Sequence, residues 1–198
     1  MRKDYEIILN LIPENSKVLD IGCSDGELIT YLENKGISAQ GVELNQEKVI
    51  KCLEKGLDVI HGDINLIVED FPFNQFDYCL LTQTIQAVQE PDKLLNTLKK
   101  VSKNIIVSFN NSARLSKISN FLLTGSFDSL LKKADSDHWY NTNYIHPCSI
   151  RDFKKLATDL DLKIISTFDV LTQKKFENGK IPSNLFCKEV LFHITNEQ

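Results

Sequence analysis

Short apolar runs alternate along the first half of the chain with stripes of apolar residues at helical spacing. The runs predict strands at 17–22, 38–43, 58–61, 76–81 and 104–109, and the stripes predict helices at 5–11, 26–35, 46–55 and 91–100. Gly36 and Gly56 follow two of these helices, at the position where a helix commonly ends. Nearly continuous apolar strands that alternate with helices are typical of a parallel sheet covered on both faces.

Two further strand-like runs, 162–170 and 187–194, lie near the end of the chain. Before them, Ser149 and Asp152 form a capping-box pattern that opens a helix. The segment 171–184 between the two runs is too short and polar for a crossover helix, so they are predicted to pair as an antiparallel hairpin. The predicted fold class is α/β: a three-layer, doubly wound, Rossmann-like sheet, mostly parallel, with an antiparallel edge hairpin.

The stretch between the two groups of strands has a different pattern. Beyond residue 109 no clear strand follows, and a mixed helical stretch lies at 115–123. The sequence therefore predicts a single domain over 1–198, with a helical insertion, or lid, at about 110–144 above the carboxyl edge of the sheet.

The composition of the chain excludes several classes of protein. The chain has 198 residues and a formal net charge of -4, which argues against binding nucleic acid through bulk charge. No apolar run is long enough to cross a bilayer and the N-terminus has no signal-peptide core, so a cytoplasmic protein without a membrane partner is expected. The five cysteines are scattered and never form a C-x-x-C pair, so reduced thiols and no metal site are expected.

A glycine loop at 22–26 follows the first strand and opens the next helix. Glycine has no Cβ and tolerates positive φ, so such a loop lets backbone N–H groups approach a nucleotide-like ligand. The spacing resembles the loop of class I S-adenosylmethionine (SAM) methyltransferases, an acidic residue followed by G-x-G-x-G. Asp20, Gly22 and Gly26 match it, and Ser24 departs from the middle glycine. A strand–helix turn that merely contains two glycines is the alternative.

Acidic residues follow the next two strands. Glu43 lies where a carboxylate binds a ribose diol in doubly wound folds, with a solvated glutamate as the alternative. Asp63 can accept the adenine amino group while Ile64 packs on the ring, with a turn-stabilising aspartate as the alternative. Because the carboxyl ends of parallel strands meet at one edge, these residues are predicted to share one crevice. Leu44 and Cys23 belong to the same predicted cofactor site.

Polar and aromatic residues further along the chain are candidates for binding a substrate. The two glutamines after the fourth strand, Gln83 and Gln86, are predicted to bind a polar cofactor tail or substrate, unless they begin a polar helix, and Thr82 and Gln83 are counted with the predicted cofactor site. The segment 139–146 includes Tyr140, and its aromatic faces could surround a sulfonium by cation–π attraction, or could simply pack the insertion. His146 could accept a proton near physiological pH, or only form a hydrogen bond near the following helix.

At these residues the chain resembles the MetW (methionine biosynthesis protein W) family nearly from end to end. The segments that carry the resemblance are 18–28, 41–43, 76–78, 82–87, 106–109, 139–142, 145–146, 150–153 and 182–185. The family usually has a glycine in place of Ser24 and a different sequence at 109–111. The resemblance implies the class I methyltransferase fold and a cytoplasmic protein of methionine biosynthesis that works with homoserine O-acyltransferase.

Two functions follow as hypotheses. The first is transfer of a methyl group from SAM to a small-molecule acceptor, with Gln83, Tyr140 and His146 orienting or deprotonating the acceptor. The alternative is a SAM-sensing, non-catalytic partner that activates homoserine O-acyltransferase, which the resemblance and the lack of an evident base favour. A third class, a nicotinamide-binding Rossmann domain, is disfavoured by Ser24 and by the loop spacing.

Overall fold

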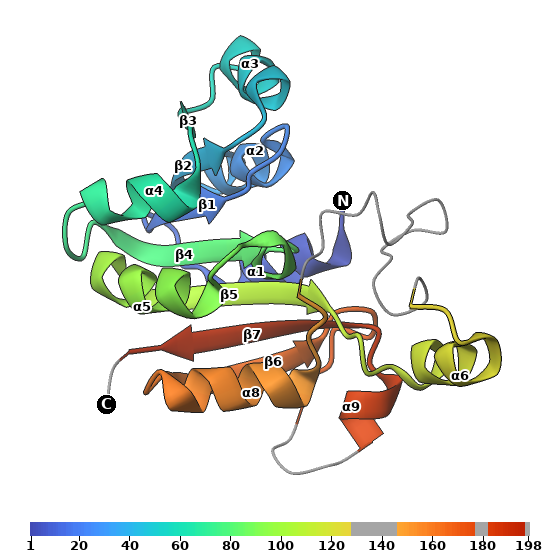
Figure 1. Ribbon diagram of the computed structural model, residues 1–198. Coiled ribbons are helices and arrows are strands. Elements are labelled where there is room, and N and C mark those ends of the chain that lie inside the picture. The colour runs from blue at the N-terminus through green and yellow to red at the C-terminus, as the bar shows by residue number, and fades with distance from the viewer. Residues whose placement is uncertain (128–145, 177–181, 197–198) are drawn as a thin grey trace.

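Seven strands form one central sheet in the computed structural model, which describes residues 1–127, 146–176 and 182–196 (Figure 1). The strand order is β3-β2-β1-β4-β5-β7-β6. The strands are β1 (Lys17–Ile21), β2 (Ser38–Glu43), β3 (Val59–His61), β4 (Phe76–Thr82), β5 (Ser102–Asn110), β6 (Lys163–Asp169) and β7 (Glu189–Thr195).

The sheet is parallel from β3 to β5 and antiparallel at its other edge. β7 runs antiparallel to both β5 and β6, and β6 is the edge strand. The predicted antiparallel hairpin is thus confirmed. In its described part, the connection between β6 and β7 contains the short helix α9 (Pro182–Phe186).

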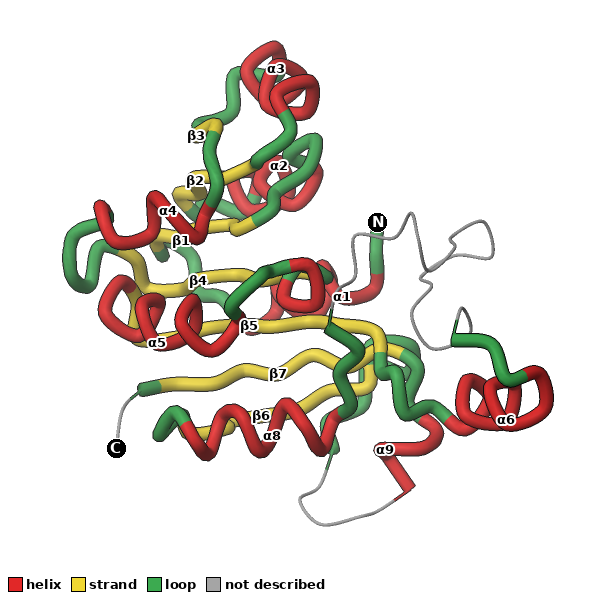
Figure 2. Tube along the Cα trace, in the orientation of Figure 1, coloured by secondary structure: helices red, strands yellow, loops and turns green. Residues whose placement is uncertain are grey.

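Helices cover both faces of the sheet, which confirms the three-layer α/β class (Figures 1 and 2). One face packs against α1 (Lys3–Leu11), α2 (Glu27–Asn34) and α3 (Gln46–Glu54). The other packs against α4 (Ile64–Ile67), α5 (Pro91–Val101) and α8 (Ile150–Asp159). The apolar stripes of the sequence are the faces that these helices turn to the sheet.

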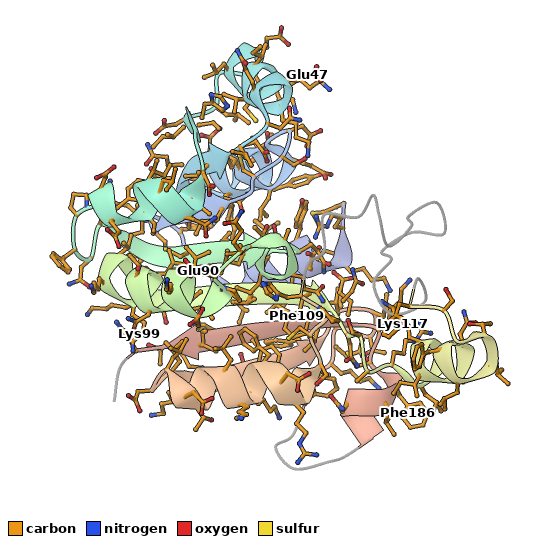
Figure 3. All side chains as sticks on the ribbon, in the orientation of Figure 1. Glu47, Glu90, Lys99, Phe109, Lys117 and Phe186 are labelled. Atoms are coloured by element: carbon orange, nitrogen blue, oxygen red, sulfur yellow. The ribbon has the colours of Figure 1, made fainter. Side chains whose placement is uncertain are left out.

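Aromatic residues fill the core beneath α8. Phe109, labelled in Figure 3, lies in this core. Its ring stacks on Phe192 with centroids 5.9 Å apart, and the ring centroid of Phe153 lies 4.6 Å from that of Phe192. All three side chains are fully buried. This cluster joins α8 to β5 and β7, and so fixes the antiparallel edge against the parallel part of the sheet.

Some element bounds differ from the sequence prediction. β4 continues one residue further than predicted, to Thr82, and β5 begins earlier, at Ser102. α4 was not predicted, because a four-residue helix is too short to show a helical apolar period. Asp63 is its N-cap residue, and Asp63 Oδ1 accepts the backbone N–H of Asn65 at 2.9 Å.

The predicted insertion is described only in part. α6 (Leu115–Thr124) lies within it, ends at Gly125 with φ +67° and projects from the carboxyl edge of the sheet (Figures 1 and 2). The rest of the insertion, 128–145, lies outside the described residues. Within the described ranges no helix has both the length and the apolar character needed to cross a bilayer.

Candidate functional site

The carboxyl ends of the parallel strands form one rim. Glu43, the last residue of β2, is paired with His61, the last residue of β3. On the other side of β2, the N–H of Gly22 donates to Val42 O at 2.8 Å. Asp63 lies two residues after the end of β3, so the glycine loop, Glu43 and Asp63 lie at the same edge of the sheet.

Thr84, in the turn after β4, packs against the glycine loop. A Cβ built on Gly22, whose φ is +74°, would lie 2.8 Å from Thr84 Oγ1, and its three nearest atoms all belong to Thr84. The Thr84 hydroxyl donates to Ile21 O at 3.0 Å. A side chain at position 22 would push this turn away, which explains the glycine there. The space beside Gly22 is therefore filled by Thr84 rather than by Ser24.

Ser24 takes the backbone conformation that a glycine would take. Its φ is +55°, in the left-handed region, which costs a residue with a Cβ about 1 kcal/mol. Its N–H donates to Glu43 Oε2 at 2.9 Å, and its carbonyl accepts the Cys52 thiol at 3.3 Å. The serine therefore preserves the path of the loop at the cost of local strain.

Glu43 connects the loop to the end of β2. Its side chain is buried, Oε2 accepts the N–H of Ser24, and Oε1 accepts the N–H of Asn45 at 2.8 Å. A carboxylate offers about four lone-pair positions, so two remain after these bonds with described residues. Leu44, next to it, is 66% exposed at the rim. A fixed acceptor beside an uncovered apolar side chain suits a ribose with an attached base.

Asp63 caps α4, as the turn-stabilising alternative supposed. Its Oδ1 accepts both the backbone N–H of Asn65 at 2.9 Å and the side-chain amide of the same residue at 2.7 Å. In the described part of the chain Oδ2 accepts no hydrogen bond, so this oxygen can still serve a ligand. Ile64 is buried in the core under α4.

Cys23 contributes only its backbone to the rim. Its thiol is buried, and a Cβ built on Gly41 would lie 2.6 Å from Cys23 Sγ, so the sulfur fills the space that this glycine leaves. Burial raises the pKa of the thiol above its usual value. The Cys23 N–H donates to Val42 O at 3.2 Å. The side chain is therefore a packing element under the loop.

Asp20, two residues before the loop, is a buried acid at 1% exposure. Its Oδ1 has no hydrogen-bond partner among the residues that the structure describes. Burial raises the pKa of the carboxyl to about 7; Arg2 opposes this change, and the nearby Asp4 and Glu43 add to it. A buried acceptor without a partner is costly, so this site suits a cationic ligand group.

Asp20 gives folding stability an unusual dependence on pH. Its folded pKa of about 7 exceeds the ordinary value of 3.8, so the native state holds a proton that the unfolded chain releases. Its contribution to the free energy of unfolding therefore falls as pH rises from about 4 to about 7. Asp20→Asn should remove this fall and gain up to about 4 kcal/mol over the unmodified protein at alkaline pH. Urea unfolding at acid and alkaline pH measures the difference, and a difference that does not change with pH would contradict it.

Gln83 is held firmly after β4. Its φ is +59°, and its N–H donates to Ser108 O at 2.9 Å. Asn110 Nδ2 donates to Gln83 Oε1 at 2.8 Å, and Gln83 Nε2 donates to Glu189 Oε1 at 2.6 Å. Thr82, just before it, is buried. A left-handed backbone kept in place by the surrounding structure is a feature that clusters at functional sites.

His146 lies against the segment that follows this turn. Its N–H donates to Gln86 O at 3.1 Å, and its ring Nε2 is 3.1 Å from Gln89 O. A carbonyl only accepts, so Nε2 carries the proton and Nδ1 is the acceptor of the neutral ring. The contact is made to the segment before α5 and not near Ser149 at the start of the following helix, where the structural alternative placed it, and it leaves one ring nitrogen for chemistry. Tyr140 lies outside the described residues.

Three residues of this edge were not predicted as site residues. Arg2 reaches it from just before α1, Asp4 from the first turn of α1, and Glu189 from the start of β7. Asp4 accepts the hydroxyl of Ser108, 104 positions away, and Glu189 accepts the amide of Gln83, 106 positions away. No local pattern in a single sequence contains pairings of this range.

Comparison with known proteins identifies the family. The model of the family described as methionine biosynthesis protein MetW matches residues 2–194. The chain belongs to this family. The bifunctional methionine biosynthesis protein MetXA/MetW of Rhodopirellula baltica is 31% identical over 205 residues, covering 98% of this chain and 33% of the relative. The chain thus spans about a third of the length of this curated relative.

Solved structures share the fold of this MetW family member at low identity. A TehB-like SAM-dependent methyltransferase from Corynebacterium glutamicum matches with a TM-score of 0.67 and 14% identity, covering 100% of this chain and 89% of that one. A SAM-dependent methyltransferase from Aquifex aeolicus has a TM-score of 0.65 and 18% identity, with 98% and 90% covered. The [4+2]-cyclase SpnF has a TM-score of 0.68 and 14% identity, with 98% and 80% covered. These likenesses show the fold alone.

Proposed function

We propose that the chain binds SAM at the carboxyl edge of its sheet and transfers the methyl group to a small-molecule acceptor. The observation that carries the proposal is the Glu43 carboxylate, which is fixed by the N–H groups of Ser24 and Asn45 and keeps unused lone pairs. An ionised acceptor that is already oriented suits the two hydroxyls of a ribose. Membership of the MetW family and the SAM-dependent methyltransferases of the same fold support this choice.

The other residues of the rim suit the remaining parts of the cofactor. Exposed Leu44 and buried Ile64 would contact the adenine ring, and Asp63 Oδ2 would accept its amino group. Asp20, whose Oδ1 has no partner in the described chain, would face a cationic group. The other proposed cofactor-binding residues, all at the same edge, are Gly22, Cys23, Ser24, Gly26, Thr82 and Gln83.

The protein's part in the chemistry is positioning. Bound SAM supplies a methyl group already activated by its sulfonium, so the chain must orient the acceptor and exclude water. The amide of Gln83, fixed by Asn110 and Glu189, would orient the acceptor. His146 would receive the acceptor's proton on Nδ1, because Nε2 is already bonded to a carbonyl. Tyr140 is proposed as a further orienting group.

Thermal unfolding tests the choice of cofactor. SAM or S-adenosylhomocysteine at a hundred times its Kd should raise the Tm by about 5–10 °C, since such binding adds about 2.7 kcal/mol to the folded state. NAD at the same concentration should leave the Tm unchanged. A shift with NAD, or none with either adenosyl ligand, would refute the proposal.

A second function is favoured by the fused relative. MetXA and MetW occur in one chain in Rhodopirellula baltica, and two proteins joined in one organism often associate as separate chains in another. We infer as the alternative that this protein is a SAM-sensing, non-catalytic activator of homoserine O-acyltransferase. A SAM-dependent effect requires that SAM bind the activating state more tightly than the other.

Co-purification with homoserine O-acyltransferase tests this alternative. The two proteins should elute together, and SAM should change both the association and the rate of acyl transfer. Glu43→Gln should abolish the response to SAM while leaving the SAM-independent association intact, because Glu43 is buried at the cofactor rim. An acyltransferase rate that is indifferent to the added protein would reject it.

A further inference from the structure

Helix α6 projects from the carboxyl edge of the sheet and carries apolar side chains that are open to solvent (Figure 1). Every residue of α6 is at least partly exposed. Leu115 and Leu122 are seven residues apart and therefore lie on one face of the helix. Leu122 and its neighbour Leu123 are 76% and 86% exposed. Apolar side chains gathered on the surface in this way indicate a site of contact with another molecule.

The ends of α6 join this helix to further exposed apolar side chains. After its last turn, the exposed ring of Phe127 packs on Phe121 with centroids 5.0 Å apart. Before its first turn, the side-chain amide of Asn111 donates to Cys187 O at 2.9 Å, which fixes the end of α9 beside the start of the α6 segment. Phe186, the last residue of α9, is exposed (Figure 3).

Cations border these apolar side chains. Arg114 is the N-cap residue of α6, and Lys188 lies two residues after α9. Neither forms an ion pair with any residue that the structure describes. Burial, together with the nearby Arg114 and Lys188, lowers the pKa of Lys117, so the three cations lie close together. We call the following residues the basic face: Arg114, Leu115, Lys117, Leu122, Leu123, Phe127, Phe186 and Lys188.

A second exposed apolar surface carries the opposite charge. Leu66 of α4 is 76% exposed, and Phe73, three residues before β4, is 77% exposed. Glu69 and Asp70 lie between them in the short 3₁₀ helix η1 (Val68–Asp70) and are exposed. Neither acid forms an ion pair with a residue in the described ranges. We call Leu66, Glu69, Asp70 and Phe73 the acidic face.

The two faces lie at opposite ends of the sheet (Figure 1). Phe73 comes just before Phe76, which is paired with Ser102 at the amino ends of β4 and β5. The basic face begins beyond Asn110, the last residue of β5. A strand of nine residues such as β5 is about 30 Å long, so the two faces of one chain cannot contact each other.

We propose that the basic face of one copy of this chain binds the acidic face of a second copy, head to tail. Both faces present exposed apolar side chains, and their charges are opposite in sign. Pairing two basic faces or two acidic faces would instead bring like charges together, which opposes binding. The proposed contact joins two different surfaces, so each added copy leaves one face of each kind open. The assembly can therefore grow beyond a dimer.

Sedimentation velocity at rising concentration tests the contact. The unmodified protein should associate into species larger than a dimer as its concentration rises through the micromolar range. Leu123→Asp and Leu66→Asp should each weaken this association at least about tenfold, since each puts an acid in place of an apolar side chain at the contact. Both side chains are exposed, so neither substitution should prevent folding, and the Tm of each variant checks this.

Mixing the two variants gives the sharper test. Leu123→Asp keeps an intact acidic face, and Leu66→Asp keeps an intact basic face. The mixture should therefore form a one-to-one dimer that grows no further, although neither variant associates alone. Leu53→Asp is the matched control: Leu53 is exposed on α3, outside both faces, so its substitution should leave the association unchanged.

Four results would overturn the proposal. The unmodified protein could remain a monomer throughout, or the control could weaken the association as much as the two test variants do. The mixture could remain monomeric. If only one of the two substitutions weakened the association, the face that it alters would pair with itself, and the contact would not be head to tail.

Discussion

Gly26→Ala should lower the free energy of unfolding by about 2–4 kcal/mol. Gly26 closes the glycine loop at φ +76°, a conformation that costs a residue with a Cβ about 1 kcal/mol. The added methyl group would also clash with Leu57 Cδ1 and lie 3.1 Å from Cys52 Sγ, and overpacking of this kind costs about 1–3 kcal/mol. Urea unfolding followed by circular dichroism measures the sum.

Gly56→Ala is the matched control. Gly56 has the same φ of +76°, but a Cβ built on it meets nothing within 4 Å. This variant should therefore lose only the conformational part, about 1 kcal/mol. If both variants lost the same free energy, the packing of Leu57 and Cys52 under the loop would not be what requires glycine at position 26.

Glu43→Gln should weaken binding of SAM and S-adenosylhomocysteine by roughly 100-fold or more. The amide has a single oxygen, so it cannot accept from both Ser24 N and Asn45 N as the carboxylate does. It also carries no charge for the ribose hydroxyls, and a hydrogen bond to a charged group contributes about 1.5–3 kcal/mol. Two such bonds amount to the stated factor or more. Calorimetric titration gives the two affinities directly.

Glu47→Gln serves as the comparison for this second variant. Glu47 is an exposed residue of α3 (Figure 3), so removing its charge should change the affinity by less than about twofold. The Tm of each variant without ligand separates a loss of binding from a loss of folding. An affinity of Glu43→Gln within about twofold of the unmodified protein would mean that the ribose is bound elsewhere.

The sheet was predictable because its signals are local. Each parallel strand is an apolar run of a few residues, and the hairpin follows from the short polar segment between β6 and β7. Glycines at the loop and acids at the strand ends are also local, and the doubly wound topology brings such positions to one edge. The sequence alone therefore predicts that Gly22, Glu43 and Asp63 lie at one edge of the sheet.

Several parts of the site depend on tertiary contacts. The guanidinium of Arg2 is fixed at the carboxyl edge because Asp4 and Tyr5 orient it and because Ser108 anchors Asp4 across the sheet. Likewise, the sequence shows only that Ser24 replaces the middle glycine of the loop pattern. The structure shows that its backbone still takes the left-handed conformation of a glycine. A single sequence records neither the distance between such groups nor the strain that a fold tolerates.

The turn after β4 touches two neighbours through adjacent residues. Thr84 rests on Gly22, while Gln83 is tied to Asn110 and Glu189 on the opposite side. A displacement of the loop at Gly22 would thus be transmitted to Gln83 within one peptide unit. If cofactor and acceptor each bind more tightly to one position of this turn, their affinities are linked. The factor by which bound cofactor changes the affinity for the acceptor then equals the factor by which bound acceptor changes the affinity for the cofactor.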